Sequence, residues 1–253
     1  MSSMFPADNP QSGATADPFL DVLSIAAHRD DTELTIGGTL IKMVDLGYRV
    51  GILDLTQGEM GSRGSADDRE HEAQCAAKTI GIHHRENLLL PDSGGELTRE
   101  NKLKVSAVLR RLRPKVVILP YWEGRHPDHF HASEIGRDAC FYAGLKKLDL
   151  PGEPFRPFKM IYAAAYFNIV PTFVVDITDQ FERRWEAVKC YKTQFFQFEE
   201  GDKTFPPPEA LYDRVATRCK YFGSLIGRQY GEGFIQKEVL EVADIMQLPV
   251  RSV

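Results

Sequence analysis

Apolar residues along the chain form two patterns, short continuous runs and residues at helical spacing, and each pattern predicts one kind of element. Residues 19–27 form a short apolar run closed by a polar cluster, which is typical of a buried parallel strand. Residues 32–46 carry apolar side chains at helical spacing and end at Gly47, and residues 49–55 form a second apolar run. This order of strand, helix and strand predicts a βαβ unit.

The alternation continues through the first half of the chain and becomes less regular in the second half. The first half adds helices at 66–80 and 99–112 and strands at 87–90 and 115–119. The second half predicts strands at 160–166 and 173–175 and helices at 178–193 and 209–226. Such alternation predicts one α/β domain, Rossmann-like, with an open, mostly parallel sheet and helices on both faces.

Polar clusters follow three of the predicted strands, where the carboxyl ends of parallel strands meet. They occupy residues 28–33, 56–64 and 125–129. The first cluster holds His28 and adjacent carboxylates, and the third holds two histidines. Nitrogen and oxygen donors of this kind suit a borderline metal such as zinc, and two histidines with one carboxylate leave a position for water.

Each cluster also has an interpretation without a metal. Asp30 and Asp31 suit the N-terminus of a helix, where a carboxylate accepts backbone hydrogen bonds. The run 126–129 is typical of a helix start with proline in its first turn. Because both clusters follow strands of one predicted sheet, their combination favours a metal site. The other histidines are interpreted as surface or supporting residues: His71, His83, His84 and His131.

Composition and charge narrow the class of protein. The 253 residues, 43% of them hydrophobic, suffice for one domain with its own core. The net charge of -5 gives no electrostatic case for binding nucleic acid. Four widely spaced cysteines without a CxxC pair are interpreted as buried thiols in a reducing compartment. They are Cys75, Cys140, Cys190 and Cys219.

The first 18 residues have neither a basic segment followed by an apolar one nor a membrane span. We expect residues 1–18 to be a disordered tail and residues 19–253 to be the domain. A cytoplasmic protein that does not contact a membrane is the corresponding expectation.

The polar clusters resemble the motifs A-H-P-D-D-x-E and H-P-D-H of the PIG-L/LmbE-like zinc-dependent N-acetylglucosamine deacetylases. The resemblance runs from about residue 20 to 234. The stretches 191–195 and 230–234 are most similar to the branch that deacetylates N-acetylglucosaminyl malate in bacillithiol biosynthesis. Arg29 replaces the proline of the first motif, a change expected to alter the rigidity of the loop and the charge at the rim.

The resemblance implies a division of labour around the metal. His28, Asp31 and His129 would bind Zn²⁺, or another divalent metal such as Fe²⁺, and Asp30 would act as the general base. His126 would stabilise the oxyanion or protonate the leaving amine.

Further roles follow from the same resemblance. Asp128 would orient the histidine that precedes it by two residues. Arg69 and Arg156 resemble positions that contact substrate, with a surface ion pair as the alternative for each. Tyr230 would close the pocket or, alternatively, pack in the core.

The implied function is hydrolysis of the N-acetyl group of an amino-sugar conjugate by a homo-oligomer, up to a hexamer. One alternative is a different N-acetylglucosamine conjugate, such as a chitin fragment or a mycothiol precursor. A nucleotide-binding module is another, but GxGxxG is absent where strand 19–27 meets its helix. A metal-bound regulatory protein is the third, and Asp30 and His126 beside the ligands argue against it.

Overall fold

The computed structural model describes residues 19–93, 97–164, 169–197, 207–248 and 250. The strands are β1 (Val22–Ala26), β2 (Val50–Thr56), β3 (His84–Leu90), β4 (Val116–Pro120), β5 (Lys159–Ala163), β6 (Phe173–Asp176) and β7 (Gly231–Ile235). The α-helices are α1 (Asp31–Asp45), α2 (Ala66–Ile80), α3 (Arg99–Leu112), α4 (Pro127–Ala143), α5 (Phe181–Lys189), α6 (Lys192–Phe195) and α7 (Pro208–Ser224). Short 3₁₀ helices η1 (Thr178–Gln180) and η2 (Ile245–Gln247) complete the described elements.

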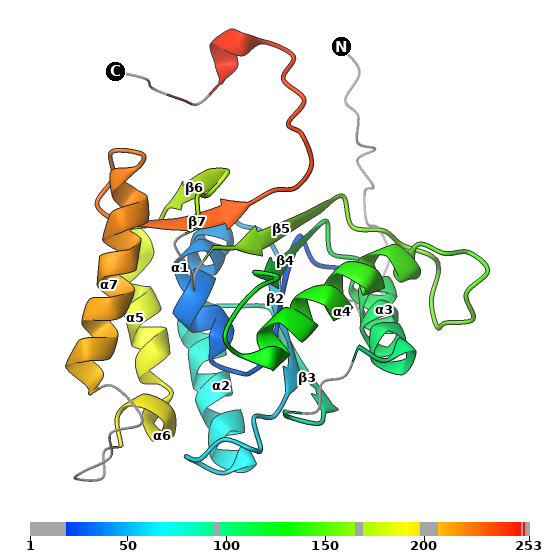
Figure 1. The fold of residues 1–253 in the computed structure, drawn as a ribbon, viewed down its shortest axis with the longest axis horizontal. Coiled ribbons are helices and arrows are strands. Elements are labelled where there is room, and N and C mark those ends of the chain that lie inside the picture. Colours follow the sequence, from blue (N-terminus) through cyan, green and yellow to red (C-terminus); the bar gives the residue numbers. More distant parts are fainter. Residues whose placement is uncertain (1–18, 94–96, 165–168, 198–206, 249, 251–253) are drawn as a thin grey trace.

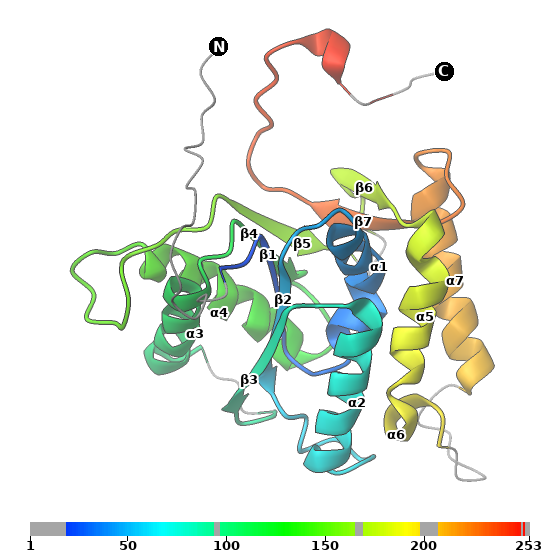
Figure 2. The ribbon, with the colours of Figure 1, turned by 180° about the vertical axis from the view of Figure 1, so that it is seen from behind.

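The strands form a single sheet in the order β3-β2-β1-β4-β5-β7-β6. Strands β1 to β5 pair in parallel, whereas β7 is antiparallel to both β5 and β6. Helices α1, α2 and α5 cover one face and α3 and α4 cover the other (Figures 1 and 2). The structure therefore confirms the predicted α/β fold with a mostly parallel sheet.

The central strands are buried because helices lie on both sides of them. Every residue of β1 and of β2 is buried, which explains their nearly unbroken apolar runs. Helix α7 packs outside this layer, against α5 and β7, through a smaller apolar cluster. The sheet thus holds β1 firmly between β2 and β4, the position from which the candidate site is built.

The second half of the chain differs most from the sequence prediction. The helix predicted at 178–193 is divided into η1, α5 and α6. Strand β5 ends at Ala163, and residues 165–166 of the predicted strand lie outside the described residues. Strand β7 was not predicted, because glycines weaken a strand signal. Gly233 lies so close to the Phe222 ring that a Cβ would come within 2.7 Å of it.

The cysteine prediction was wrong for one pair. Cys75 in α2 and Cys190 after α5 form a disulfide, with 5.8 Å between their Cα atoms. Helices α2 and α5 pack together, which brings residues 115 positions apart in sequence into bonding range. Cys140 and Cys219 are buried thiols as expected. The cysteines therefore give no argument for a reducing compartment.

Two expectations concern the tail and the membrane. Residues 1–18 lie outside the described residues, so the disordered tail stays a prediction. Among the helices that are described, none combines the length and the apolar character needed to cross a bilayer.

Helix α1 has a kink, and a side chain of β7 caps the helical segment that follows the kink. Ile36 has non-helical backbone angles, with φ of -136°, and divides the helix. Glu232 of β7 accepts hydrogen bonds from the backbone N–H groups of Gly38 at 3.0 Å and Thr39 at 2.7 Å. The N–H groups that begin a helical segment need such acceptors. The same carboxylate pairs with Arg184 of α5 at 3.3 Å, and both side chains are 2% exposed.

We expect Glu232→Ala to lower the free energy of unfolding by about 3–5 kcal/mol, because it removes a helix cap and leaves the buried Arg184 without its carboxylate. Urea unfolding followed by circular dichroism measures this change. Glu238→Ala, at an exposed position beyond β7, is the control. Equal stability of the two variants would contradict a capping role.

Candidate metal centre

The candidate site lies where the strand order reverses. Strand β1 pairs with β2 on one side and with β4 on the other, and the connection after β1 leads to β2 whereas the connection after β4 leads in the opposite direction, to β5. Open α/β sheets bind ligands at such a point. The segments that follow β1, β3 and β4 meet there, at the lower edge of the sheet in Figure 1.

Three side chains converge at this edge. The distance from His28 Nδ1 to His129 Nε2 is 3.3 Å. Asp31 completes a triangle of three residues and turns a different carboxylate oxygen to each histidine: its Oδ2 is 3.3 Å from His28 Nδ1, and its Oδ1 is 3.1 Å from His129 Nε2. His28 follows β1, Asp31 begins α1, and His129 lies in the first turn of α4. The structure thus brings together the three residues expected to bind the metal.

The spacing of these donors fits a tetrahedral metal. Zinc–ligand bonds of 2.0–2.1 Å at tetrahedral angles place neighbouring donor atoms about 3.3 Å apart. The two histidine nitrogens have this separation, and one ligand atom from each of the three residues lies within 4.8 Å of the others. Two imidazoles and one carboxylate are also the donor types of catalytic zinc sites.

The electrostatics of the cluster favour a positive charge. Burial lowers the pKa of His28, but hydrogen bonds to Asp128, Asp31 and Asp92 outweigh burial and raise that pKa to about 12. Burial likewise raises the pKa of the Asp31 carboxyl, but His129 and His28 hold it well below its usual range. The carboxylates thus stabilise a cation at this position, as a divalent metal requires.

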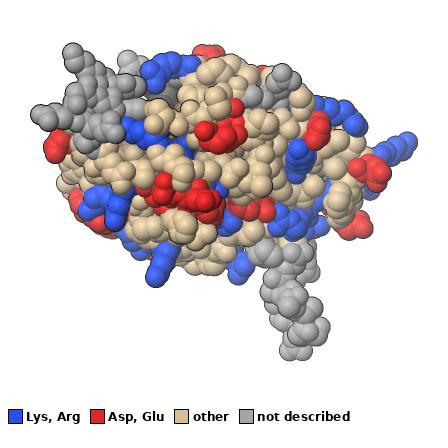
Figure 3. Space-filling model, turned by 90° about the horizontal axis from the view of Figure 1, so that it is seen from below, with Lys and Arg blue, Asp and Glu red and all other residues tan. Residues whose placement is uncertain are grey.

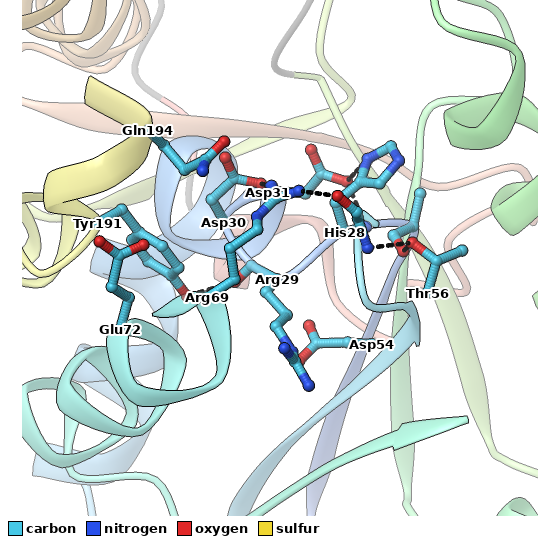
Figure 4. A network of polar contacts seen from close by, with 12 residues as sticks. His28, Arg29, Asp30, Asp31, Asp54, Thr56, Arg69, Glu72, Tyr191 and Gln194 are labelled. Atoms are coloured by element: carbon cyan, nitrogen blue, oxygen red, sulfur yellow. Dashed lines mark hydrogen bonds and ion pairs between the residues drawn. The ribbon is translucent and has the colours of Figure 1, made fainter. Parts of the chain in front are cut away.

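Asp30 lies next to the triangle and is not part of it. It occupies the N-cap position of α1, yet its side chain accepts no capping hydrogen bond from the described first turn. Its Oδ1 lies 3.5 Å from Nη2 of Arg69, which extends from α2 toward it (Figure 4). Arg69 also donates to the carbonyl oxygen of Gly58 at 2.8 Å. The cap interpretation therefore does not account for Asp30.

His126 packs against both histidines of the triangle. Its ring centroid is 4.9 Å from that of His28 and 4.8 Å from that of His129. Its Nδ1 accepts a hydrogen bond from the backbone N–H of Asp128 at 3.3 Å. Burial, then the charges of His28 and His129, lowers the pKa of His126, so the ring is neutral at pH 7 with its proton on Nε2.

The carboxylate of Asp128 has a different partner from the one expected. Its Oδ2 accepts a hydrogen bond from the backbone N–H of Ser93 at 2.8 Å and lies 3.5 Å from His28 Nε2. The contact with His126 comes from the backbone of Asp128, because residues two apart at a helix start present their side chains in different directions.

Sequence reasoning missed Asp92, which follows β3. Its Oδ1 lies 3.1 Å from His28 Nε2, and its Oδ2 accepts a hydrogen bond from the backbone N–H of Met60 at 2.9 Å. The side chain is 5% exposed. The rule that selected polar residues after strands would have found Asp92, because β3 ends two residues before it.

Arg29 does not change the charge at the rim as expected. Its guanidinium is buried, pairs with Glu70 and donates to the carbonyl oxygen of Ala66 at 2.8 Å. Its own carbonyl oxygen accepts hydrogen bonds from Tyr191 and Arg85. These bonds fix the loop after β1 where the family motif has a proline.

Two residues expected to contact substrate lie elsewhere. Arg156 precedes β5 at the opposite edge of the sheet, where its guanidinium lies 4.8 Å from the Phe141 ring. Phe141 follows His129 by 12 residues in α4, about 18 Å along the helix. Tyr230 packs in the core, stacked on Phe181 with 3.8 Å between ring centroids. Both assignments followed from the resemblance, which matches positions along the sequence and does not fix these directions.

A small cavity of about 20 Å³ lies beside the triangle, at the carboxyl ends of β1 and β4. Asp31, His129 and Tyr121 contribute to its lining. Its volume is enough for a water molecule. This edge, viewed from below in Figure 3, carries interspersed acidic and basic side chains among the described residues.

Comparison with known proteins shows the family to which this chain belongs. A family model described as "PIG-L: GlcNAc-PI de-N-acetylase" matches residues 23–140. Diacetylchitobiose deacetylase from Thermococcus kodakarensis is 30% identical over 237 residues, which cover 86% of this chain and 84% of that protein. This chain belongs to the PIG-L family. Membership in the PIG-L family confirms the expectation of an enzyme, an N-deacetylase.

Two solved structures are similar to this PIG-L protein. The conserved protein TT1542 from Thermus thermophilus has 39% sequence identity and a TM-score of 0.80, covering 89% of this chain and 98% of its own. N,N'-diacetylchitobiose deacetylase from Pyrococcus horikoshii, complexed with its inhibitor MPG, has 27% identity and a TM-score of 0.74. That alignment covers 84% of this chain and 82% of the other.

Proposed function

We propose that this PIG-L protein hydrolyses the N-acetyl group of an N-acetylglucosaminide with the help of Zn²⁺ held by His28, Asp31 and His129. The observation that carries the proposal is the convergence of the three side chains, each of which contacts the other two at 3.1 to 3.3 Å. Fe²⁺ takes similar donors and is the alternative metal. A divalent metal supplies Lewis acidity, which polarises the acetamide carbonyl and lowers the pKa of water.

Asp30 is proposed as the general base. Its carboxylate lies beside the triangle without being part of it, so it can take the proton of the attacking water while Asp31 neutralises the metal. Arg69, 3.5 Å away, restricts the directions in which Asp30 can point. Neighbouring aspartates thereby take different roles.

His126 is proposed to donate a hydrogen bond to the developing oxyanion or to the leaving amine. The backbone N–H of Asp128 occupies its Nδ1, so the proton on Nε2 is the one available for donation. An amide leaves poorly unless its nitrogen is protonated, so the reaction needs such a donor. In this proposal Asp30 accepts a proton from water and His126 donates a hydrogen bond or a proton.

The finer proposal for the substrate is N-acetylglucosaminyl malate, in which Arg69 would pair with a malate carboxylate. A chitin fragment is the alternative, supported by the names of the relatives from Thermococcus kodakarensis and Pyrococcus horikoshii. Both substrates present an acetamide on glucosamine, so the proposed chemistry is common to them.

Acetate release tests both levels of the proposal. Purified protein with a known zinc content is incubated separately with N-acetylglucosaminyl malate, diacetylchitobiose and N-acetylglucosamine. Acetate from any of them supports N-deacetylation, and the highest kcat/KM identifies the preferred conjugate. Zinc-loaded protein that releases no acetate from any of the three compounds would contradict the proposed function.

We expect Arg69→Ala to reduce kcat/KM at least about tenfold more for N-acetylglucosaminyl malate than for diacetylchitobiose. A hydrogen bond between charged groups contributes about 1.5–3 kcal/mol, and 1.4 kcal/mol corresponds to a factor of ten. Loss of the Asp30 contact would lower both values together, so the ratio isolates carboxylate binding. Arg111→Ala, which removes an exposed pair with Glu86, is the control. Equal losses for both substrates would refute carboxylate recognition by Arg69.

A cytoplasmic location and a homo-oligomer, up to a hexamer, stay predictions from sequence. Cell fractionation and size-exclusion chromatography with light scattering test them.

A further inference from the structure

We propose that Asp92 is a positioning residue that holds His28 with its Nδ1 directed into the metal triangle. The inference rests on the proposed function, because it concerns a proposed ligand of the metal. It starts from the two ring nitrogens of His28, which face different partners. Nδ1 faces Asp31 and His129, and Nε2 faces Asp92 Oδ1 at 3.1 Å.

The contact with Asp92 selects one tautomer of the neutral ring. An ionised carboxylate only accepts hydrogen bonds, so the Nε2 that it contacts must carry a proton. In a neutral imidazole the other nitrogen then has the free lone pair. That nitrogen is Nδ1, the atom in the triangle. A carboxylate behind a histidine ligand fixes the tautomer and the ring orientation in this way.

Asp92 is itself held in place by two further hydrogen bonds. Its Oδ2 accepts from the backbone N–H of Met60 at 2.9 Å, and its own backbone N–H donates to Glu59 Oε1 at 2.8 Å. The side chain is 5% exposed, which limits competition by water. Asp92 therefore links the loop after β2 and the loop after β3 to the histidine after β1.

Asp128 supports the same nitrogen less directly. Its Oδ2 is 3.5 Å from His28 Nε2, compared with 3.1 Å for Asp92, and accepts a hydrogen bond from Ser93. A contact of 3.5 Å is at the limit of a hydrogen bond. Asp92 is thus the nearer acceptor for Nε2–H.

Asp92→Asn is expected to favour the other tautomer of His28. The Met60 N–H donates to Asp92 and could bond only to the oxygen of an amide, so the amide oxygen would keep that partner and the NH₂ group would face His28 Nε2. Two donors cannot share a hydrogen bond, so the ring would favour the tautomer with its proton on Nδ1. That proton would point into the triangle and compete with the metal.

The test is the zinc dissociation constant of Asp92→Asn, measured by competition with a chromophoric chelator. We expect zinc binding to weaken about 10- to 100-fold, the usual effect of removing a partner behind a metal ligand. Asp21→Asn is the matched control, because Asp21 also accepts one backbone N–H, from Arg49, and one side-chain donor, Lys115, at the other edge of the sheet. We expect its zinc affinity to be unchanged.

A second readout does not depend on the metal. In ¹⁵N-labelled wild-type protein, the Nε2 resonance of His28 should show a directly bonded proton with and without zinc, and Asp92→Asn should lose or shift it. A wild-type Nε2 without a proton would overturn the inference, as would equal zinc affinities of wild type and Asp92→Asn. Wild-type protein that binds no zinc would contradict the proposed function, and a shift of the His28 Nε2 resonance in Asp92→Asn would still support the role of Asp92. If Asp92→Asn fails to fold, the wild-type resonance decides.

Discussion

Replacing Asp30 with asparagine is expected to lower turnover by about 10²- to 10⁴-fold while the metal stays bound, the usual cost of losing a general base. The amide keeps the size of the side chain but cannot accept the proton of water. The contact with Arg69 would persist through the amide oxygen, so the fold should be retained. Steady-state acetate release and zinc analysis of the same preparation measure both quantities.

Asp31→Asn is the matched comparison, one residue further along the chain. Asp31 belongs to the donor triangle, so its replacement should weaken zinc binding first and lower activity as a consequence. Near-normal turnover of zinc-loaded Asp30→Asn would mean that another residue is the base, and His126 is the first to examine.

Removing the metal is expected to abolish acetate release, and adding Zn²⁺ back is expected to restore it. Wild-type protein should hold about one zinc per chain. Loss of a residue that only hydrogen-bonds to a metal ligand weakens metal binding roughly 10- to 100-fold, and His129→Ala should weaken it more than that. The reason is that a site with three protein ligands loses one of them. Metal analysis after dialysis against a chelator, followed by assays with added zinc, measures this.

His71→Ala controls for the loss of a histidine, because His71 is exposed on α2. Full zinc occupancy in His129→Ala, or undiminished acetate release from chelator-treated wild type, would sink the proposed ligand set.

The sequence by itself determined the sheet and the edge at which the chemistry lies. Strands buried on both faces need almost continuous apolar runs, so β1 and β2 could be found from pattern alone. Parallel strands place their carboxyl ends together, so polar residues after β1 and β4 were expected to meet. His28, Asp31 and His129 do meet, 101 positions apart at the extremes.

Only the tertiary structure decided contacts that depend on side-chain direction and distant packing. The pairing of Cys75 with Cys190 depends on how α2 packs against α5. Tyr230 lies in the core and Arg156 lies at the opposite edge of the sheet. The sequence around each residue does not determine the direction in which its side chain points. Strand β7 was not predicted because glycines weaken the strand pattern, and the packing of the Phe222 ring against Gly233 appears only in the tertiary structure.

The clearest case is the pair of carboxylates behind His28. The motif places Asp128 near His126 in sequence, yet its carboxylate lies nearer His28 in space, and Asp92 comes from a third strand end. A sequence names the residue types that can bind a metal. Which nitrogen of a histidine faces the metal is set by the hydrogen bond at the other nitrogen, and that bond exists only after β1, β3 and β4 have packed into one sheet.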